Sequence, residues 1–263
     1  GAWRIAASAS ASRQKADAVW YQDSLCRVEP TKENYMELMR LALRFDVPDF
    51  AVNAIKSVEK EARNDPEFHR LAAQAYKRAG RITAAEMQLV QLTQLQHGDL
   101  TAQLDLAEIE LADDSGHRDT ALRARVLALA AHTELRVRAL RMLLRDNIAG
   151  KVTAGTADLV RQLQLTAGLD VSSRLLAIQA LYMLGDPSAP KLLAQLQVDS
   201  ADKPQDVARV LEFYLLTGQP EKAPPWVATL PDATRKDQAV QHMVAEALLK
   251  LRDEAGLAAY LEG

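Results

Sequence analysis

The chain has 263 residues, of which 48% are hydrophobic, 25% charged and only 5% aromatic, and its net charge is −3. The hydrophobic and charged fractions are ordinary for a globular protein, whereas the scarcity of aromatic residues argues against a protein built from β-sheets. Nucleic-acid-binding proteins are usually distinctly basic, so the pI of about 6.0 also disfavours that class.

Residues 1–30 are predicted to precede the main domain. Residues 2–12 are rich in Ala and Ser and include Trp3 and Arg4. This stretch is interpreted either as the remnant of a membrane anchor or signal segment, or as a frayed helical lead-in. The compartment therefore stays open: the chain is soluble as given, or it is the soluble part of a membrane-anchored or exported protein. No apolar run approaches the roughly 18 residues that a spanning helix needs.

The first predicted elements are a capping helix and a helix pair. The capping helix is predicted from four apolar residues before position 30, which are Val19, Trp20, Leu25 and Val28. Pro30 disfavours helical backbone in the residue before it, and Thr31 is then a suitable N-cap. The helix that follows has apolar residues at the spacing i, i+3, i+4 and i+7, namely Tyr35, Leu38, Met39 and Ala42. After a turn at 46–49, the second helix has an apolar stripe of Ala51, Ile55 and Val58.

The next helix pair is predicted over 66–99. Asp65 is its N-cap and Pro66 occupies the first turn. Gly80 ends the first helix, because glycine accepts the left-handed conformation found at helix C-termini. The apolar stripes of the two helices are Leu71, Ala72, Ala75, Tyr76 and Ala79, then Ala85, Leu89 and Leu92.

Helix pairs are predicted to continue to the C-terminus, with three irregularities. The third pair, from about Leu100, has two extra residues in its turn at 113–117. The fourth pair, about 136–169, contains three glycines that weaken a helix if they lie inside it, Gly150, Gly155 and Gly168. In the sixth pair, Pro224 and Pro225 predict that the second helix starts late or is short.

A register of 34 residues links these pairs, with one step of 36 in the third pair. The first helices share Met39, Ala73, Ala107, Leu143, Ala177, Leu211 and Ala245. The second helices share Ala51, Ala85, Ala121, Gly155, Ala189, Ala223 and Leu257, and one turn later Ile55, Leu89, Arg125, Leu159, Leu193, Val227 and Leu261. Small residues that recur at a fixed interval, followed by large apolar ones, indicate a stacked helical-repeat protein.

The helix–turn–helix unit of 34 residues resembles the tetratricopeptide repeat (TPR). The residues that carry the resemblance best are Ala72, Ala73, Tyr76, Gly80, Ala85, Leu89 and Leu92. The family's signature Trp and its closing Pro are mostly absent, so a related α-solenoid stays an alternative for the middle of the chain. The resemblance implies an all-α fold, a right-handed superhelical solenoid of about seven antiparallel repeats. The implied domains are residues 1–30, lead-in and capping helix, and residues 31–263, the TPR-like repeat domain.

The resemblance also implies a function, that of a scaffold or adaptor that binds a peptide or protein segment in a concave groove. Such a protein has no small-molecule substrate, no cofactor and no chemistry of its own. The family's groove positions correspond here to Arg40, Arg44, Arg70, Gln74, Lys77, Arg78, Arg174 and Tyr182, and also to Glu108, Glu212, His242 and Glu246. The implied groove is basic in its N-terminal half and more acidic near its end. Because arginine binds carboxylates in a bidentate manner, Arg40, Arg70, Gln74 and Arg78 have two interpretations: a site for an acidic or C-terminal peptide segment, or ordinary groove polarity without such a ligand.

No catalytic or metal-binding motif emerges from the sequence. The five histidines form no H-E-x-x-H pair and have no cysteine at ligand spacing. Gly150-Lys151 lacks the upstream glycine of a phosphate-binding loop, and 113–117 lacks the alternating oxygens of a calcium loop. The single cysteine, Cys26, cannot form an internal disulfide and is expected to be inert. We therefore expect a non-enzymatic protein without a metal.

Arginines are concentrated between residues 117 and 145. Arg138, Arg141 and Arg145 fall at i, i+3 and i+7, which places them on one helix face. This basic patch has two interpretations: a binding site for an acidic protein, lipid headgroup or nucleic acid, or a solvated face bridged to neighbouring acids.

Three alternatives to a free-standing adaptor follow from the sequence. The first is a structural or assembly component tethered to a membrane through a missing N-terminal segment. The second is the non-catalytic helical-repeat part of a larger protein. The third is a helical-repeat nucleic-acid binder, whose affinity falls steeply with salt.

Overall fold

The computed structural model describes residues 17–113 and 119–262, and over these residues the protein is all-α, with no β-strand. The predicted all-α class is therefore confirmed. The chain divides into two compact units, residues 1–129 and 130–263. The proposed lead-in at 2–12 and most of the turn at 113–117 lie outside the described residues.

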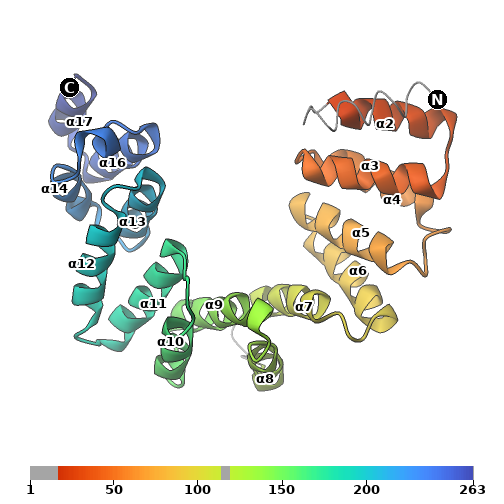
Figure 1. The fold of residues 1–263 in the computed structure, drawn as a ribbon, viewed down its shortest axis with the longest axis horizontal. Coiled ribbons are helices and arrows are strands. Elements are labelled where there is room, and N and C mark those ends of the chain that lie inside the picture. The colour runs from red at the N-terminus through yellow and green to blue at the C-terminus, as the bar shows by residue number, and fades with distance from the viewer. Residues whose placement is uncertain (1–16, 114–118, 263) are drawn as a thin grey trace. The chain divides into compact units, whose positions relative to one another are not determined.

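Unit 1 consists of a first helix followed by three helix pairs (Figure 1). The helices are α2 (Asp17–Val28), α3 (Lys32–Arg44), α4 (Pro48–Val58), α5 (Pro66–Arg78), α6 (Ile82–Leu95), α7 (Leu100–Asp113) and α8 (Thr120–Leu129). Each helix packs against the next in the chain, and α3 also packs against α5. The arrangement is compatible with a helical repeat, since the first helices of two successive pairs are in contact.

Unit 2 continues the succession of helix pairs. Its helices are α9 (Thr133–Ala149), α10 (Thr156–Gln164), α11 (Val171–Leu184), α12 (Ala189–Ser200), α13 (Pro204–Leu216), η1 (Pro220–Lys222), α14 (Ala223–Val227), α15 (Asp232–Arg235), α16 (Gln238–Leu251) and α17 (Glu254–Glu262). The first helices of successive pairs contact each other, α9 with α11, α11 with α13 and α13 with α16. The helix with Pro224 and Pro225 is short, as predicted.

The predicted helix boundaries are confirmed by their hydrogen bonds and backbone angles. The hydroxyl of Thr31 accepts from the backbone N–H of Asn34 at 3.3 Å, and the carboxylate of Asp65 accepts from that of Glu67 at 2.9 Å. Gly80 has a φ of +71°, the left-handed conformation that ends α5. The three glycines of the fourth pair lie outside its helices, so they do not weaken them.

The register of the first helices is confirmed as a core position. Six of the seven residues are no more than 4% exposed, namely Met39, Ala73, Ala107, Leu143, Ala177 and Leu211, and Ala245 is half-buried. Small side chains at these positions let neighbouring helices approach closely, and the larger ones fill the core.

The register of the second helices is wrong in α8 and at the start of α10. In α8 the predicted positions Ala121 and Arg125 are exposed, and Leu122, Val126 and Leu129 are buried instead. Asp119 accepts hydrogen bonds from the backbone N–H groups of Ala121 and Leu122 and so starts the helix there. Because an α-helix turns by about 100° per residue, an offset of one residue moves each predicted contact off the buried face.

In α10 the register is displaced only at Gly155, since Leu159 is buried as predicted. Gly155 has a φ of +74° and lies outside the helix as its N-cap, so the buried position passes to Thr156. The hydroxyl of Thr156 accepts from the side-chain amide of Asn147 at 2.7 Å and donates to the carbonyl of Val152 at 2.6 Å. These buried hydrogen bonds connect α9, α10 and the turn between them.

The predicted capping helix is present as α2, with half of its predicted apolar face buried. Val19 and Leu25 are buried, whereas Trp20 is 56% exposed and Val28 is exposed as well. The side-chain amide of Gln22 donates to the carbonyl of Asn34 at 2.9 Å and so fixes α2 on α3. None of the described helices is both long and apolar enough to cross a membrane.

Cys26 is expected to resist thiol reagents while the protein is folded. It is buried in α2, and its pKa is raised to about 11 by burial first and then by the nearby charge of Asp23. At pH 8 the reactive thiolate is then about one thousandth of the population, against about a quarter for a free cysteine. We expect no labelling by a chromogenic disulfide reagent at pH 8 over minutes, and one equivalent once the protein is denatured. Rapid native labelling would contradict the burial of this thiol.

Candidate binding grooves

Two of the predicted groove cations of unit 1, Arg40 and Arg70, are already paired with carboxylates from farther along the chain. The Arg40 guanidinium donates to Glu67 Oε1 at 2.8 Å, which joins α3 to α5. Arg70 donates to Asp99 Oδ2 at 2.8 Å. These carboxylates belong to the chain itself and occupy the place that the carboxylates of a bound peptide would take.

Four further predicted residues of this surface lie on the same two helices. The Lys77 ammonium is 2.7 Å from Glu108 Oε2 on α7, so the predicted groove acid is the partner of a predicted groove cation. Arg78 donates to the backbone carbonyl of Leu43. The Arg44 guanidinium lies 5.6 Å from the ring centroid of Phe45, and Gln74 is exposed. Of these side chains, only Gln74 and Arg44 have no hydrogen bond within the described part of the chain.

Unit 2 contains a groove of about 380 Å³ between α9, α11 and α13. We call it the arginine groove. Its lining residues are Arg141, Arg145, Ser172, Leu175, Leu176, Gln179, Arg209, Glu212, Phe213 and Leu216. Each of the three helices is the first of its pair, so the groove runs across successive helix pairs.

Helical spacing explains why these side chains share one groove. Arg141 and Arg145 are one turn apart on α9, and α11 and α13 each contribute residues at i, i+3, i+4 and i+7. Leu175 and Phe213 are buried and form an apolar floor, whereas Leu216 is 77% exposed at the edge. The groove therefore combines cations with a surface that can receive apolar side chains.

The arginines of this groove are weakly paired. The nearest distance between Arg141 and Asp170 is 3.4 Å, and Arg209 Nη1 lies 3.0 Å from Glu212 Oε2 on its own helix. Arg145 is exposed and has no hydrogen-bond or ion-pair partner within 17–113 and 119–262. At least one guanidinium is thus available to an incoming anion.

Asp170 lies close enough to Arg141 and Arg209 for both of their charges to act on its carboxyl group. Partial burial acts to raise the pKa of this carboxyl, but hydrogen bonding from Ser173 and the charges of Arg141 and Arg209 outweigh it, so the pKa lies below its usual value. Because both arginines act on one carboxylate, their charges converge near the N-terminus of α11.

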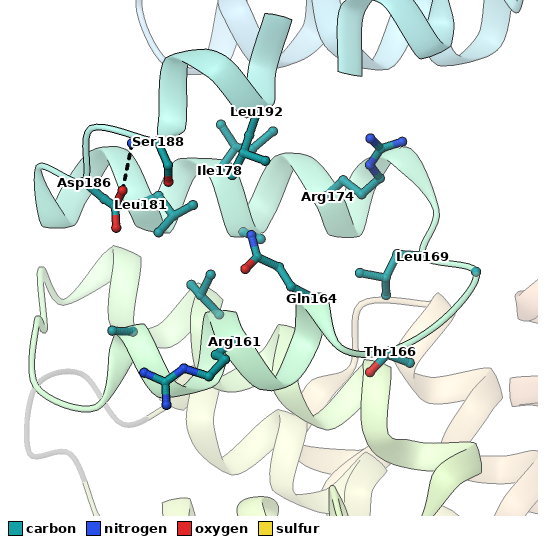
Figure 2. A pocket seen from close by; sticks show the side chains of 14 residues that line it. Arg161, Gln164, Thr166, Leu169, Arg174, Ile178, Leu181, Asp186, Ser188 and Leu192 are labelled. Carbon is teal, nitrogen blue, oxygen red and sulfur yellow. Dashed lines mark hydrogen bonds between the residues drawn. The ribbon is translucent and has the colours of Figure 1, made fainter. Parts of the chain in front are cut away.

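A second groove of about 840 Å³ lies between α10, α11 and α12 (Figure 2). We call it the α10–α12 groove. Its lining residues are Ala157, Val160, Arg161, Gln164, Thr166, Gly168, Leu169, Arg174, Ala177, Ile178, Leu181, Asp186, Ser188 and Leu192. Figure 2 shows Gln164 directed from α10 toward α11, with Ile178 and Leu192 on the opposite wall. The predicted residue Arg174 lines this groove and forms an ion pair with Asp199 at 2.7 Å.

Helix α11 separates the two grooves. Residues 172, 175, 176 and 179 line the arginine groove, and residues 174, 177, 178 and 181 line the α10–α12 groove. The two sets are offset by two residues, which is about 200° around the helix, so they lie on opposite faces. Helix α11 also contacts α9, α10, α12 and α13, which agrees with the absence of a single apolar face in its sequence.

The remaining predicted residues lie outside both grooves or at one of their edges. Tyr182 and Arg138 line neither groove, although Arg138 is on the same helix as Arg141 and Arg145. Burial raises the pKa of Tyr182. Glu212 lines the arginine groove, whereas His242 and Glu246 do not. Two of the three basic-patch arginines are thus brought together with a predicted groove residue.

The sequence prediction missed Arg209, although the 34-residue register contained the signal. Leu175 lies 34 residues after Arg141, and Arg209 lies 34 residues after Leu175. The same interval relates Arg145, Gln179 and Phe213. Applying the register to the arginines, and not only to the core residues, would have placed Arg209 beside the basic patch.

The described residues contain no cluster of three or more His, Cys, Asp or Glu side chains that could hold a metal ion. No family model matches the sequence, and no curated protein matches it either, so the interpretation of both grooves depends on their own residues.

Proposed function

We propose that this chain is a TPR-like protein that acts as a scaffold or adaptor, with no chemistry of its own, and that it holds an acidic segment of another protein in the arginine groove. In this proposal the helix pairs form a right-handed superhelical solenoid, and the first helix of each pair faces the bound segment. Contacts between successive first helices, α9 with α11 and α11 with α13, support this arrangement.

The observation that carries the proposal is the exposed, unpaired Arg145 beside two weakly paired arginines. In unit 1, Arg40, Arg70 and Lys77 have carboxylate partners from farther along the chain at 2.7–2.8 Å. In the arginine groove no such partner binds Arg145 in the part of the chain that the structure describes. An unpaired guanidinium next to an apolar floor favours a ligand with both a carboxylate and apolar side chains.

The groove is well suited to binding without a large ordering cost. The packed helices fix the backbone and the buried floor of the groove, so the backbone loses little conformational entropy when a segment binds. The affinity is expected to depend on salt, because exposed charges are screened over about 8 Å at physiological ionic strength.

A peptide array tests the proposal, with acidic, neutral and basic degenerate peptides that all contain leucine. We expect the protein to bind the acidic set, and Arg145→Glu to weaken this binding about tenfold or more, because it replaces a charge-assisted hydrogen bond with repulsion. Arg27→Glu is the matched control, since it makes the same charge change at an exposed residue of α2. Absence of acidic binding, or equal loss in both variants, would refute the proposal.

A further inference from the structure

We propose that the negative charge selected by the arginine groove is a phosphate monoester on a serine or threonine of the partner segment. The inference depends on the proposed function, because it concerns the same groove and adds the chemical group that is recognised. It is argued from the number of arginines, the weakness of their present pairs, the apolar floor and the position of Asp170.

The number of guanidinium groups favours phosphate over carboxylate. Three arginines from two helices, Arg141, Arg145 and Arg209, line one groove of about 380 Å³. A carboxylate has two oxygens and is satisfied by one guanidinium in a bidentate pair. A phosphate monoester has three terminal oxygens and a charge of about −1.5 to −2 at pH 7, so it can accept from all three arginines at once.

An anion with a higher charge than a carboxylate can displace the present partners of these arginines. Arg209 pairs with Glu212 on its own helix, and both side chains are about half exposed, at 59% and 46%. The distance of 3.4 Å between Arg141 and Asp170 is long for a charge-assisted hydrogen bond. Exposed pairs of this kind contribute little to stability, so breaking them costs little when the ligand binds.

The apolar floor favours a peptide as the carrier of the phosphate. Leu175, Phe213 and the exposed Leu216 line the groove together with the arginines. A phosphorylated residue with apolar neighbours in a peptide can use both parts of the groove. The polar headgroup of a phosphoinositide has no apolar part to place on this floor.

A substitution of Asp170 tests the opposite effect, an increase in affinity for the anion, because it removes a negative charge near the arginines. Its carboxylate interacts with Arg141 and Arg209, so it competes with an incoming anion and also repels it. Asp170 is the N-cap of α11 and accepts from the backbone N–H of Ser173 at 2.7 Å. Asparagine caps a helix about as well as aspartate, so Asp170→Asn removes the competing charge and keeps the cap.

The experiment measures fluorescence anisotropy at about 0.15 M salt with three degenerate peptide libraries. One library has a fixed central phosphoserine flanked by leucines, and the matched libraries have serine or glutamate there. We expect the phosphoserine library to bind at least about tenfold more tightly than either. Arg145→Gln should remove most of this advantage, and Asp170→Asn should tighten phosphopeptide binding about two- to fivefold. Arg161→Gln is the control, because Arg161 is an exposed arginine of the α10–α12 groove.

The other outcomes of this experiment distinguish a failure of the phosphate inference from a failure of the proposed function. Equal binding of the glutamate and phosphoserine libraries would overturn the phosphate inference and leave the proposed function standing. If neither library bound, both would be overturned. Binding confined to vesicles that contain phosphatidylinositol bisphosphate would overturn the inference in favour of a membrane ligand. An Asp170→Asn variant with unchanged or weaker phosphopeptide binding would also count against it, provided that circular dichroism shows an intact fold.

Discussion

Replacing Phe68 with alanine is expected to lower the free energy of unfolding by about 3–5 kcal/mol. Phe68 is completely buried and is the largest fully buried side chain among residues 17–113 and 119–262. It lies in the first turn of α5, a helix that packs against α3, α4 and α6. Removing the ring takes away its transfer free energy and leaves a cavity among helices that cannot close completely around it.

Hydrogen–deuterium exchange of backbone amides measures this effect best, because it resolves α3–α6 from the rest of the chain. A protein with two compact units need not unfold in a single transition, so one global midpoint would be ambiguous. We expect protection in α3–α6 to fall in Phe68→Ala. The control is Leu165→Ala, at a residue 80% exposed, which should change stability by less than about 0.5 kcal/mol. Unchanged protection in α3–α6 would contradict the packing described for unit 1.

Much of the fold could be predicted from the sequence, because caps and apolar spacing are local properties. Thr31, Asp65 and Gly80 act at the helix ends where their chemistry predicts. The residues that the sequence mistook are Ala121 and Arg125 in α8 and Gly155 before α10. A turn between two helices sets the rotation of the second about its axis, and the number of turn residues alone does not fix that rotation.

The ion pairs of the candidate site could not be predicted in the same way. Spacing places Arg40 on one face of α3, but whether it meets Glu67 depends on the distance and tilt between α3 and α5. The same holds for Lys77 and Glu108, which are 31 residues apart. Sequence reasoning therefore identified the arginines of unit 1 and of α9 as equivalent candidates. The structure separates Arg40 and Arg70, which have close carboxylate partners, from Arg145, which has none among the described residues.

A larger side chain at Ala85 is expected to have the second large effect on stability, and Ala121 provides the comparison. Both alanines occupy the same position of the 34-residue register in the sequence, yet Ala85 is completely buried in α6 and Ala121 is exposed in α8. Replacing Ala85 with leucine is expected to cost about 3 kcal/mol, the upper end for over-packing, because three carbon atoms must enter a space already filled by neighbouring side chains. Ala121→Leu should change stability by less than about 0.5 kcal/mol.

The pair of variants is a direct test of the register in the two helices, since both substitutions are chemically identical and both alanines are helical. Urea denaturation followed by circular dichroism, together with amide exchange in α5–α6 and in α7–α8, gives both values. If Ala121→Leu destabilised the protein as much as Ala85→Leu, the 34-residue register would hold in α8. That result would contradict the burial of Leu122 and Val126. A cost confined to Ala85 would show that close helix contact depends on the side chain that faces the neighbour and not on its position in the sequence repeat.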